Sequence, residues 1–262
     1  MAVTGPSARL PELVARLREA GCVYAEEEAA LLLEAADGPE QLASMLARRV
    51  TGVPLEQVVG WAEFCGLRIL VDPGVFVPRR RTECLVREAV ALASMASTRP
   101  VVVDLCCGTG AVGAAVCATL PASDLHAVDI DPSAVACARR NLPPDRVHEG
   151  DLFAPLPEGL RGRVTLLLVN APYVPSDALP LMPGEARDHE PRIALDGGGD
   201  GLAVHRRVLA EAGAWLAPDG HLLVETSQHQ AGSALQLFAR AGLRPWRVDC
   251  DDLDVSVVIG SP

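Results

Sequence analysis

Apolar residues recur every three or four positions in three successive stretches near the start of the chain. The stretches cover 10–17, 26–36 and 42–50, and Gly21 stands at the end of the first. This spacing is typical of amphipathic helices, and a glycine commonly ends one. We therefore predict a small helical domain over residues 1–53.

The pattern changes to a near alternation of apolar and polar residues among glycines between residues 54 and 82. Alternation of this kind predicts a β-hairpin. From residue 83 onward, amphipathic helices alternate with short apolar strands, which indicates an open α/β sheet. The expected strands cover 100–105, 125–129, 146–153, 164–169, 220–225, 244–248 and 255–259.

Residues 174–200 show neither a helical nor a strand period and contain many prolines, glycines and acids. A loop of this length inside a compact domain is usually functional or disordered. Because it directly follows a candidate site, we expect a lid or a substrate-docking loop.

The buried strand over 164–169 ends abruptly in Asn170, Ala171, Pro172 and Tyr173. Proline ends the strand ladder and biases the preceding residue toward an extended conformation. An amide side chain, a free carbonyl and an aromatic ring are thereby held at the carboxyl edge of the sheet, where open α/β folds bind ligands. A plain turn at a strand end is the alternative, and only the rest of the chain decides between them.

A glycine-rich turn follows the strand over 100–105 and precedes a helix. Its residues are Cys106, Cys107, Gly108, Thr109 and Gly110. Backbone amides that no side chain covers, together with the N-terminus of the helix, can bind a ligand there. This motif alone suits several nucleotide cofactors.

Three acids at strand ends refine that interpretation. Asp129 closes the next strand, where a carboxylate can accept hydrogen bonds from both ribose hydroxyls. Asp104 precedes the glycines, a position that suits a cofactor with an ammonium group better than a pyrophosphate, although it could also only stabilise the turn. Asp151 and Leu152 could receive and cover an adenine ring, or Asp151 could be a simple cap. Charge complementarity therefore favours S-adenosylmethionine over NAD.

Composition narrows the classes of partner and compartment. The net charge of −11 argues against non-specific nucleic-acid binding, so we expect no stable nucleic-acid complex. The eight cysteines lack disulfide or zinc spacing, which predicts free buried thiols in a reducing compartment and no metal site. The sequence lacks an apolar span of about 20 residues, so we expect a cytoplasmic protein that does not bind membranes.

Taken together, these motifs resemble the HemK/PrmC family of protein glutamine-N5 methyltransferases. The resemblance runs from about Pro54 to the C-terminus, and its most specific part is the segment 190–202. The other matching stretches are Gly60–Phe64, Val77–Arg79 with Thr82 and Glu83, Asp104–Gly110, Asp129, Asp151–Phe153 and Asn170–Tyr173.

The resemblance implies a class I methyltransferase fold, with a seven-stranded, mostly parallel sheet and helices on both faces. It implies a helical substrate-recognition domain over 1–53, a hairpin linker over 54–82 and a methyltransferase domain over 83–262. It also implies a monomer whose protein substrate is a peptide chain release factor, methylated in its Gly-Gly-Gln loop. The cofactor would be S-adenosylmethionine, leaving S-adenosylhomocysteine as product.

The site chemistry expected from these residues is an amide clamp. We expect the Asn170 side-chain oxygen and the Ala171 carbonyl to accept hydrogen bonds from a glutamine NH2 group. Pro172 and Tyr173 would complete the clamp, with the tyrosine ring against the substrate. Substrate contacts are also expected from three residues in or beside matching stretches, namely Phe76, Arg79 and Glu190.

Four positions depart from the family pattern. Ala171 replaces the first proline of Asn-Pro-Pro-Tyr, and Arg80-Arg81 replaces a proline and an acid. Cys106 stands where a glycine is common, and Leu152 where some members have tryptophan. These departures leave open a divergent paralogue with another substrate.

Three rival functions remain at this point. A nucleic-acid amino methyltransferase could stack a flipped base on the aromatic after Asn-x-Pro. An NAD-dependent oxidoreductase could use the same glycine turn. A degenerate methyltransferase fold could serve as a partner-binding module.

Overall fold

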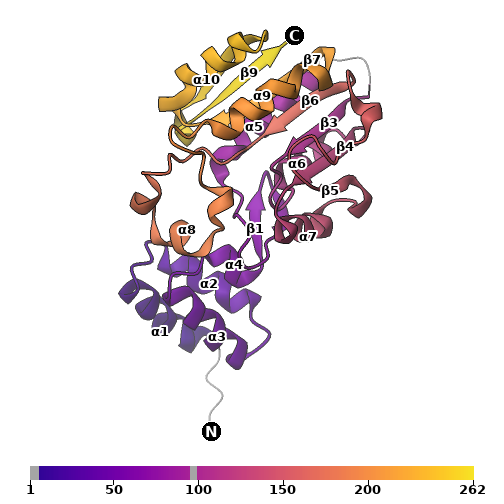
Figure 1. The fold of residues 1–262 in the computed structure, drawn as a ribbon. Helices are drawn as coiled ribbons and strands as arrows, with labels where there is room; N and C mark the ends of the chain where they lie inside the picture. The colour runs from indigo at the N-terminus through magenta and orange to yellow at the C-terminus, as the bar shows by residue number, and fades with distance from the viewer. Residues whose placement is uncertain (1–5, 95–98) are drawn as a thin grey trace.

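The computed structural model describes residues 6–94 and 99–262 of the chain. The first part is a small helical domain, drawn in indigo in Figure 1. Its members are α1 (Pro6–Glu19), α2 (Ala25–Ala35), α3 (Pro39–Val50) and the short α4 (Leu55–Val59). They pack around an apolar cluster of their own that includes Leu17, Leu32 and Leu46. The three predicted helices are confirmed, and α4 is an element that the alternating pattern hid.

The expected hairpin is present as β1 (Trp61–Phe64) and β2 (Leu67–Leu70), paired antiparallel. It rests on the large domain, because the side chain of Asn141 both accepts a hydrogen bond from the Leu70 amide and donates one to the Leu70 carbonyl, each at 2.9 Å. A third hydrogen bond of this side chain runs from Nδ2 to the carbonyl of Thr109 in the glycine turn. One asparagine thus joins the hairpin to the predicted cofactor loop.

The large domain is built on a seven-stranded sheet in the order β5-β4-β3-β6-β7-β9-β8. Every neighbouring pair is parallel except the pairs made by β9, which is antiparallel to both β7 and β8. The strands are β3 (Val101–Leu105), β4 (Asp124–Asp129), β5 (Val147–Glu149), β6 (Val164–Val169), β7 (Leu216–Thr226), β8 (Arg244–Cys250) and β9 (Val255–Ser261).

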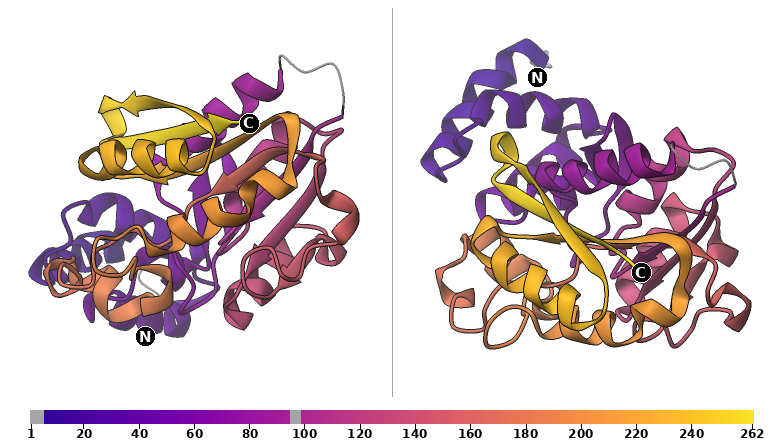
Figure 2. Two further views of the ribbon diagram at one scale, coloured as in Figure 1. Left: turned by 45° about the horizontal axis from the view of Figure 1, so that its top comes forward. Right: turned by 90° about the horizontal axis from the view of Figure 1, so that it is seen from above.

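Helices cover both faces of the sheet (Figure 2). One core cluster joins the sheet to α5 (Glu83–Ala93), α6 (Ala111–Thr119) and α7 (Pro132–Asn141). The other joins it to α9 (Ala203–Trp215) and α10 (Gln228–Arg240). The predicted class I methyltransferase architecture, with its mostly parallel seven-stranded sheet, is confirmed.

Two boundaries differ from expectation. The strand expected over 146–153 ends at Glu149, because Gly150 (φ 156°) turns the chain and Asp151 begins a loop. The segment 174–200 is not featureless: it holds α8 (Gly184–His189) and two 3-10 turns, Leu179–Leu181 and Arg192–Ala194. These turns are too short to show a hydrophobic period in the sequence.

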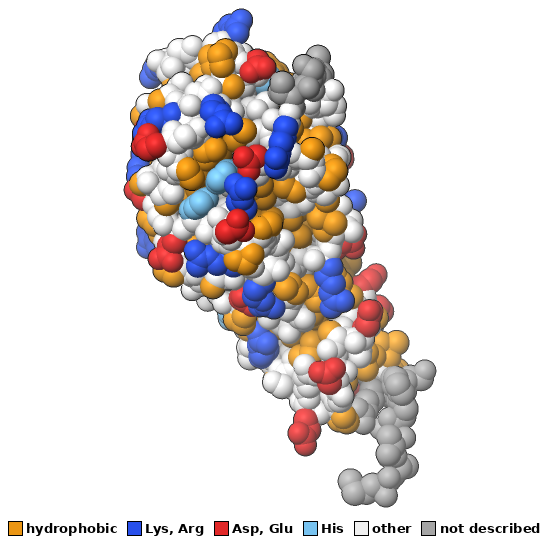
Figure 3. Space-filling model, turned by 90° about the vertical axis from the view of Figure 1, so that its right-hand side faces the viewer, with side chains coloured by type: hydrophobic (Ala, Val, Ile, Leu, Met, Phe, Trp, Pro, Cys, Tyr) orange, Lys and Arg blue, Asp and Glu red, His pale blue; other side chains and the backbone are white. Residues whose placement is uncertain are grey.

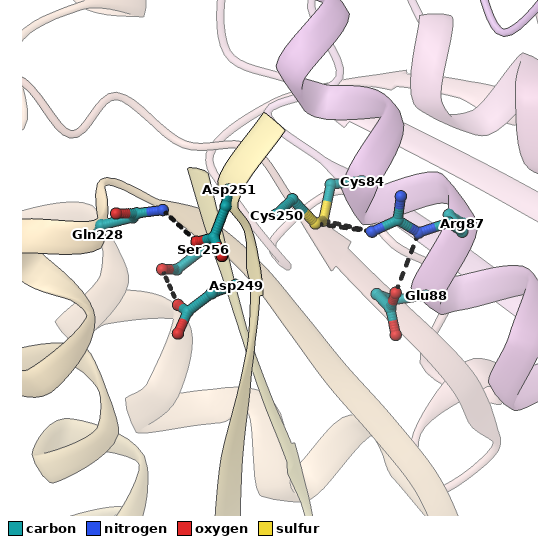
Figure 4. Close-up of a disulfide and its surroundings, with 8 residues drawn as sticks. All are labelled: Cys84, Arg87, Glu88, Gln228, Asp249, Cys250, Asp251 and Ser256. Carbon is teal, nitrogen blue, oxygen red and sulfur yellow. Dashed lines mark hydrogen bonds and ion pairs between the residues drawn. A yellow bond between two sulfur atoms is a disulfide. The ribbon is translucent and has the colours of Figure 1, made fainter. Parts of the chain in front are cut away.

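The prediction that all cysteines are free is wrong for Cys84 and Cys250, which form a disulfide (Figure 4). The two lie 166 residues apart in sequence, so no local spacing could reveal the pair. The other six cysteines are free, as expected.

Within residues 6–94 and 99–262, no helix is long and apolar enough to cross a membrane. The same residues contain no group of three or more His, Cys, Asp or Glu side chains arranged to hold a metal ion.

Candidate active site

A pocket of about 190 Å³ opens at the carboxyl edge of the sheet, where β3, β4 and β6 end side by side. Most of the predicted site residues line it. They are Phe76, Arg79, Cys106, Gly108, Asp129, Asp151, Leu152, Asn170, Ala171, Pro172 and Tyr173. The segment 174–200 forms a further wall through Val174, Met182 and Ile193 among others.

The remaining predicted residues lie just outside this pocket. Asp104, Cys107 and Thr109 line a smaller adjoining cavity of about 30 Å³, which Asn170 also borders. Gly110 lines neither cavity, and a Cβ there would lie 2.7 Å from Leu142, so its place in the turn demands a glycine. Glu190 is buried outside both cavities, which differs from the direct substrate contact that the sequence predicts.

The glycine turn brings three residues into the left-handed region, namely Cys106 (φ 58°), Gly108 (φ 55°) and Gly110 (φ 77°). A side chain in that region costs roughly 1–2 kcal/mol. This cost explains why a glycine suits position 106. Here that position holds a cysteine, whose side chain is half-buried. Two backbone hydrogen bonds hold the turn, from the Cys107 amide to the Val128 carbonyl and from the Gly110 amide to the Cys107 carbonyl.

Asp129 is fixed at the end of β4 by two backbone amides. Its Oδ2 accepts a hydrogen bond from Gly108 at 2.8 Å and its Oδ1 one from Asp131 at 3.0 Å. Burial raises the pKa of this carboxyl, while the two amides oppose the shift. A carboxylate has about four acceptor positions, so the side chain keeps capacity for a ligand in the pocket.

Asp104 is almost completely buried, and its Oδ2 accepts a hydrogen bond from the Gly113 amide at 2.9 Å. The side chain therefore braces the start of α6, which is the alternative role that the sequence left open. Burial, helped by the charge of Asp129, raises the pKa of Asp104 to about 7 against the opposing effect of the Gly113 amide.

Asp151 and Leu152 lie in the loop that follows the carboxyl end of β5. The Asp151 carboxylate pairs with Arg207 of α9 at 2.5 Å, a partner that the sequence did not suggest. Leu152 has φ 48° and a buried side chain that lines the pocket. The pair thus offers an apolar surface beside a hydrogen-bond acceptor.

The amide of Asn170 has a defined orientation. Its Nδ2 donates a hydrogen bond to the hydroxyl of Thr82 at 3.2 Å. No hydrogen bond from the described part of the chain reaches its Oδ1 or the carbonyl of Ala171. Both residues line the pocket, so two acceptors without a partner in the described residues lie side by side in the chain at the end of β6.

Tyr173 is held at both ends. Its hydroxyl donates to Glu225 Oε1 at 3.2 Å, and its carbonyl accepts from Gln230 Nε2 at 2.9 Å. The Arg81 guanidinium lies over the ring, with Cζ 5.7 Å from the centroid. Burial and the charge of Glu225 raise the pKa of the phenol, so it stays protonated at neutral pH.

Sequence reasoning missed Thr82, Glu225, Gln230 and Arg207. For Glu225 a signal existed, because it ends the strand beside β6, and the carboxyl ends of parallel strands meet at one edge. Thr82 stands in a stretch that matches the family, but the match gave it no role. Gln230 and Arg207 lie on helices whose spacing says nothing about the pocket. Only the fold brings them to the site.

Comparison with known proteins agrees with this geometry. The family profile "Methyltransferase small domain" matches residues 66–179. A release factor glutamine methyltransferase of Geobacter sulfurreducens is 38% identical over 211 residues, covering 78% of this chain and 72% of that protein. A 4-amino-L-phenylalanine/4-methylamino-L-phenylalanine methyltransferase of Streptomyces pristinaespiralis is 36% identical, covering 78% and 71%.

Among solved structures, a ribosomal protein L11 methylase from Lactobacillus delbrueckii subsp. bulgaricus superposes with a TM-score of 0.51 at 14% identity, covering 74% of this chain and 84% of that one. This likeness concerns the fold alone. The sequence relatives carry the assignment further, because further release factor glutamine methyltransferases match at 34–39% identity over most of the chain. The chain belongs to the release factor glutamine methyltransferase family.

Proposed function

We propose that this protein transfers the methyl group of S-adenosylmethionine to the side-chain amide nitrogen of a glutamine in a peptide chain release factor. The observation that carries the proposal is the orientation of Asn170. Because its NH2 group is engaged by Thr82, its oxygen is presented to the substrate, beside the Ala171 carbonyl. Two acceptors on adjacent residues match in number the two N–H groups of a primary amide.

The residues around the pocket fit S-adenosylmethionine, which belongs to the family chemistry. Asp129 offers acceptors for ribose hydroxyls, and Leu152 offers an apolar face for adenine beside the Asp151 acceptor. Asp104 supplies a carboxylate in the adjoining cavity that an ammonium group would complement. When bound, this cofactor supplies a methyl group on a positive sulfur.

The work of the protein is then to position the amide. The glutamine nitrogen is a weak nucleophile because its lone pair is delocalised into the carbonyl. Hydrogen bonds to Asn170 Oδ1 and the Ala171 carbonyl hold both N–H groups and turn the lone pair toward the methyl group. Positioning of this kind can supply roughly 7–11 kcal/mol of the barrier. The new N–C bond would form as the bond between the methyl group and sulfur breaks, with S-adenosylhomocysteine as the leaving group. The nitrogen becomes acidic as it gains the methyl group, and one of its protons leaves to water.

Tyr173 does not act as the base in this scheme, since its phenol donates to Glu225 and its pKa is raised. The ring instead forms a flat wall for the substrate amide and its methylene groups. Pro172 beside it fixes the direction of the chain. Phe76 and Arg79 line the same pocket.

We further propose that the helical domain docks the protein substrate. The domain is tied to the pocket wall, because Arg49 of α3 pairs with Glu185 of α8 at 2.6 Å. A docked protein would therefore act on the segment that borders the pocket. On the face shown in Figure 3, arginines are scattered among acidic side chains rather than joined in one basic surface, which disfavours a nucleic-acid substrate.

The decisive experiment is incubation with S-adenosylmethionine labelled in its methyl group and three candidate acceptors. These are a release factor with a Gly-Gly-Gln loop, 4-amino-L-phenylalanine, and total RNA. We expect label on the loop glutamine, and none on a release factor whose glutamine is replaced by glutamate. Asn170→Ala should abolish the transfer and leave cofactor affinity unchanged. Label on the free amino acid or on RNA would replace the proposal by that substrate.

A further inference from the structure

Glu225 is a buried carboxylate that lies at the site but does not line the pocket. It is only 1% exposed, and it stands on β7 directly after Val224, which pairs with Val169 of β6. Asn170 follows Val169, so Asn170 and Glu225 are neighbours at the sheet edge. A charge in such a place is costly unless it has partners.

Two of its partners, Tyr173 and Arg81, line the pocket. The phenol of Tyr173 donates to Oε1 at 3.2 Å, and Arg81 Nε lies 3.6 Å from the same oxygen. Burial raises the pKa of Glu225, while the Thr82 hydroxyl, Arg81 and Tyr173 each lower it. The other oxygen, Oε2, is buried and accepts no hydrogen bond within the described residues.

Thr82 connects this carboxylate to the second clamp residue. Its hydroxyl accepts the hydrogen bond from Asn170 Nδ2 at 3.2 Å, and it is among the groups that lower the pKa of Glu225. A negative charge near a hydroxyl attracts its proton and leaves the oxygen lone pairs to other donors, here the amide NH2. The charge of Glu225 thereby favours the orientation in which Asn170 presents its oxygen to the substrate.

We infer that Glu225 is a positioning residue for methyl transfer, which orients Asn170 through Thr82 and Tyr173 directly. The inference rests on the proposed function, since it concerns the same clamp. One buried carboxylate thereby orients the side chains of both Asn170 and Tyr173, the first and last residues of this loop. This arrangement supplies by hydrogen bonding part of the rigidity that Ala171, in place of a proline, does not supply.

The kinetic test compares Glu225→Gln, Tyr173→Phe and the double variant. Because misplacement of a reacting group by about 1 Å can cost roughly 100-fold, we expect each single variant to lower kcat by roughly 10- to 100-fold. The affinity for S-adenosylhomocysteine should stay within about twofold. If the two side chains act as one unit, the double variant should be no slower than the slower single variant.

Thr226→Val is the matched control. Thr226 is the next residue on β7, fully buried, and its hydroxyl has no hydrogen-bond partner among the described residues. This variant should keep the kcat of the parent. A Glu225→Gln enzyme with unchanged kcat, or losses in kcat that simply add in the double variant, would overturn the inference. If Glu225→Gln fails to fold, an unchanged kcat in Tyr173→Phe has the same consequence.

A second readout separates this inference from the proposed function. The chain has two tyrosines, so in a Tyr24→Phe background a ring-labelled tyrosine reports Tyr173 alone by NMR. We expect the ring chemical shift of Tyr173 to change in Glu225→Gln and to remain the same in Thr226→Val. If no release factor is methylated but the signal behaves in this way, the proposed substrate fails and the contact stands. An unmoved signal overturns the role of Glu225.

Discussion

Arg79 and Glu190 join two distant parts of the chain at the pocket. Arg79 Nη2 donates to Glu190 Oε1 at 2.6 Å, across 111 residues of sequence. The same oxygen accepts from the Val77 amide at 3.1 Å, and the Arg79 guanidinium lies 5.1 Å from the Phe76 ring centroid. Glu190 therefore fixes the 76–79 stretch against the wall formed by 174–200.

Glu190→Gln should weaken this connection. It keeps an acceptor for the Val77 amide but loses the charge that Arg79 pairs with, in a side chain with no exposed surface. Bonds to charged groups contribute roughly 1.5–3 kcal/mol, so a drop in unfolding free energy of that order is expected. The KM for the protein substrate should rise more than kcat falls. Arg192→Gln, which breaks an exposed pair with Asp196, is the control and should change neither.

Asp104 predicts a pH dependence of cofactor binding. Its pKa is raised to about 7 by burial, so near pH 5.5 the carboxyl is mostly neutral. An ammonium group prefers the carboxylate, so affinity for S-adenosylmethionine should rise as the pH increases from 5.5 to 7.5 and then level off. Calorimetry across this range checks it. Asp104→Asn keeps an acceptor for the Gly113 amide and should flatten the profile.

The same shift has the opposite consequence for stability. A carboxyl whose pKa is raised on folding stabilises the protein most below its unfolded pKa of about 4, and the contribution is lost as pH rises toward 7. Urea unfolding of the cofactor-free protein should therefore show a fall in stability between pH 4.5 and 7 that Asp104→Asn makes smaller, while the other buried carboxyls with raised pKa, such as Asp129 and Glu225, keep the rest of it. A profile unchanged by the substitution would refute the assignment of the shift to Asp104.

Asp129→Asn tests the ribose assignment. The asparagine can still accept one backbone hydrogen bond, but its NH2 group faces either the Gly108 or the Asp131 amide and cannot accept from it. We expect cofactor affinity to fall by roughly 10- to 100-fold, the loss of about 1.5–3 kcal/mol per bond to a charged group. Unchanged binding would mean that Asp129 only braces the turn. Asp177→Asn, at an exposed position outside the pocket, serves as control.

The sequence predicts the parts of this fold that rest on local patterns. Buried strands such as Val164–Val169, and the glycines after β3, carry signals within a few residues of the feature they predict. The contacts that orient the site are long-range. Tyr173 and Glu225 lie 52 residues apart, and Asn170 and Thr82 lie 88 apart. The spacing of residues in the sequence does not show which distant side chains meet, because these contacts depend on the packing of the sheet edge against α5.

The disulfide between Cys84 and Cys250 gives a prediction about stability. It ties the start of α5, two residues after Thr82, to the end of β8, and Arg87 donates to the Cys250 sulfur (Figure 4). A cross-link that closes so long a loop typically stabilises by about 2–4 kcal/mol. Cys250→Ser should therefore lower Tm by several degrees, whereas Cys65→Ser, at an exposed free thiol, should not. Because both sulfurs of the pair are buried, a mild reductant should leave the disulfide of the folded protein intact at temperatures well below Tm. Equal Tm values for Cys250→Ser and the parent would show that the cross-link does not stabilise the fold.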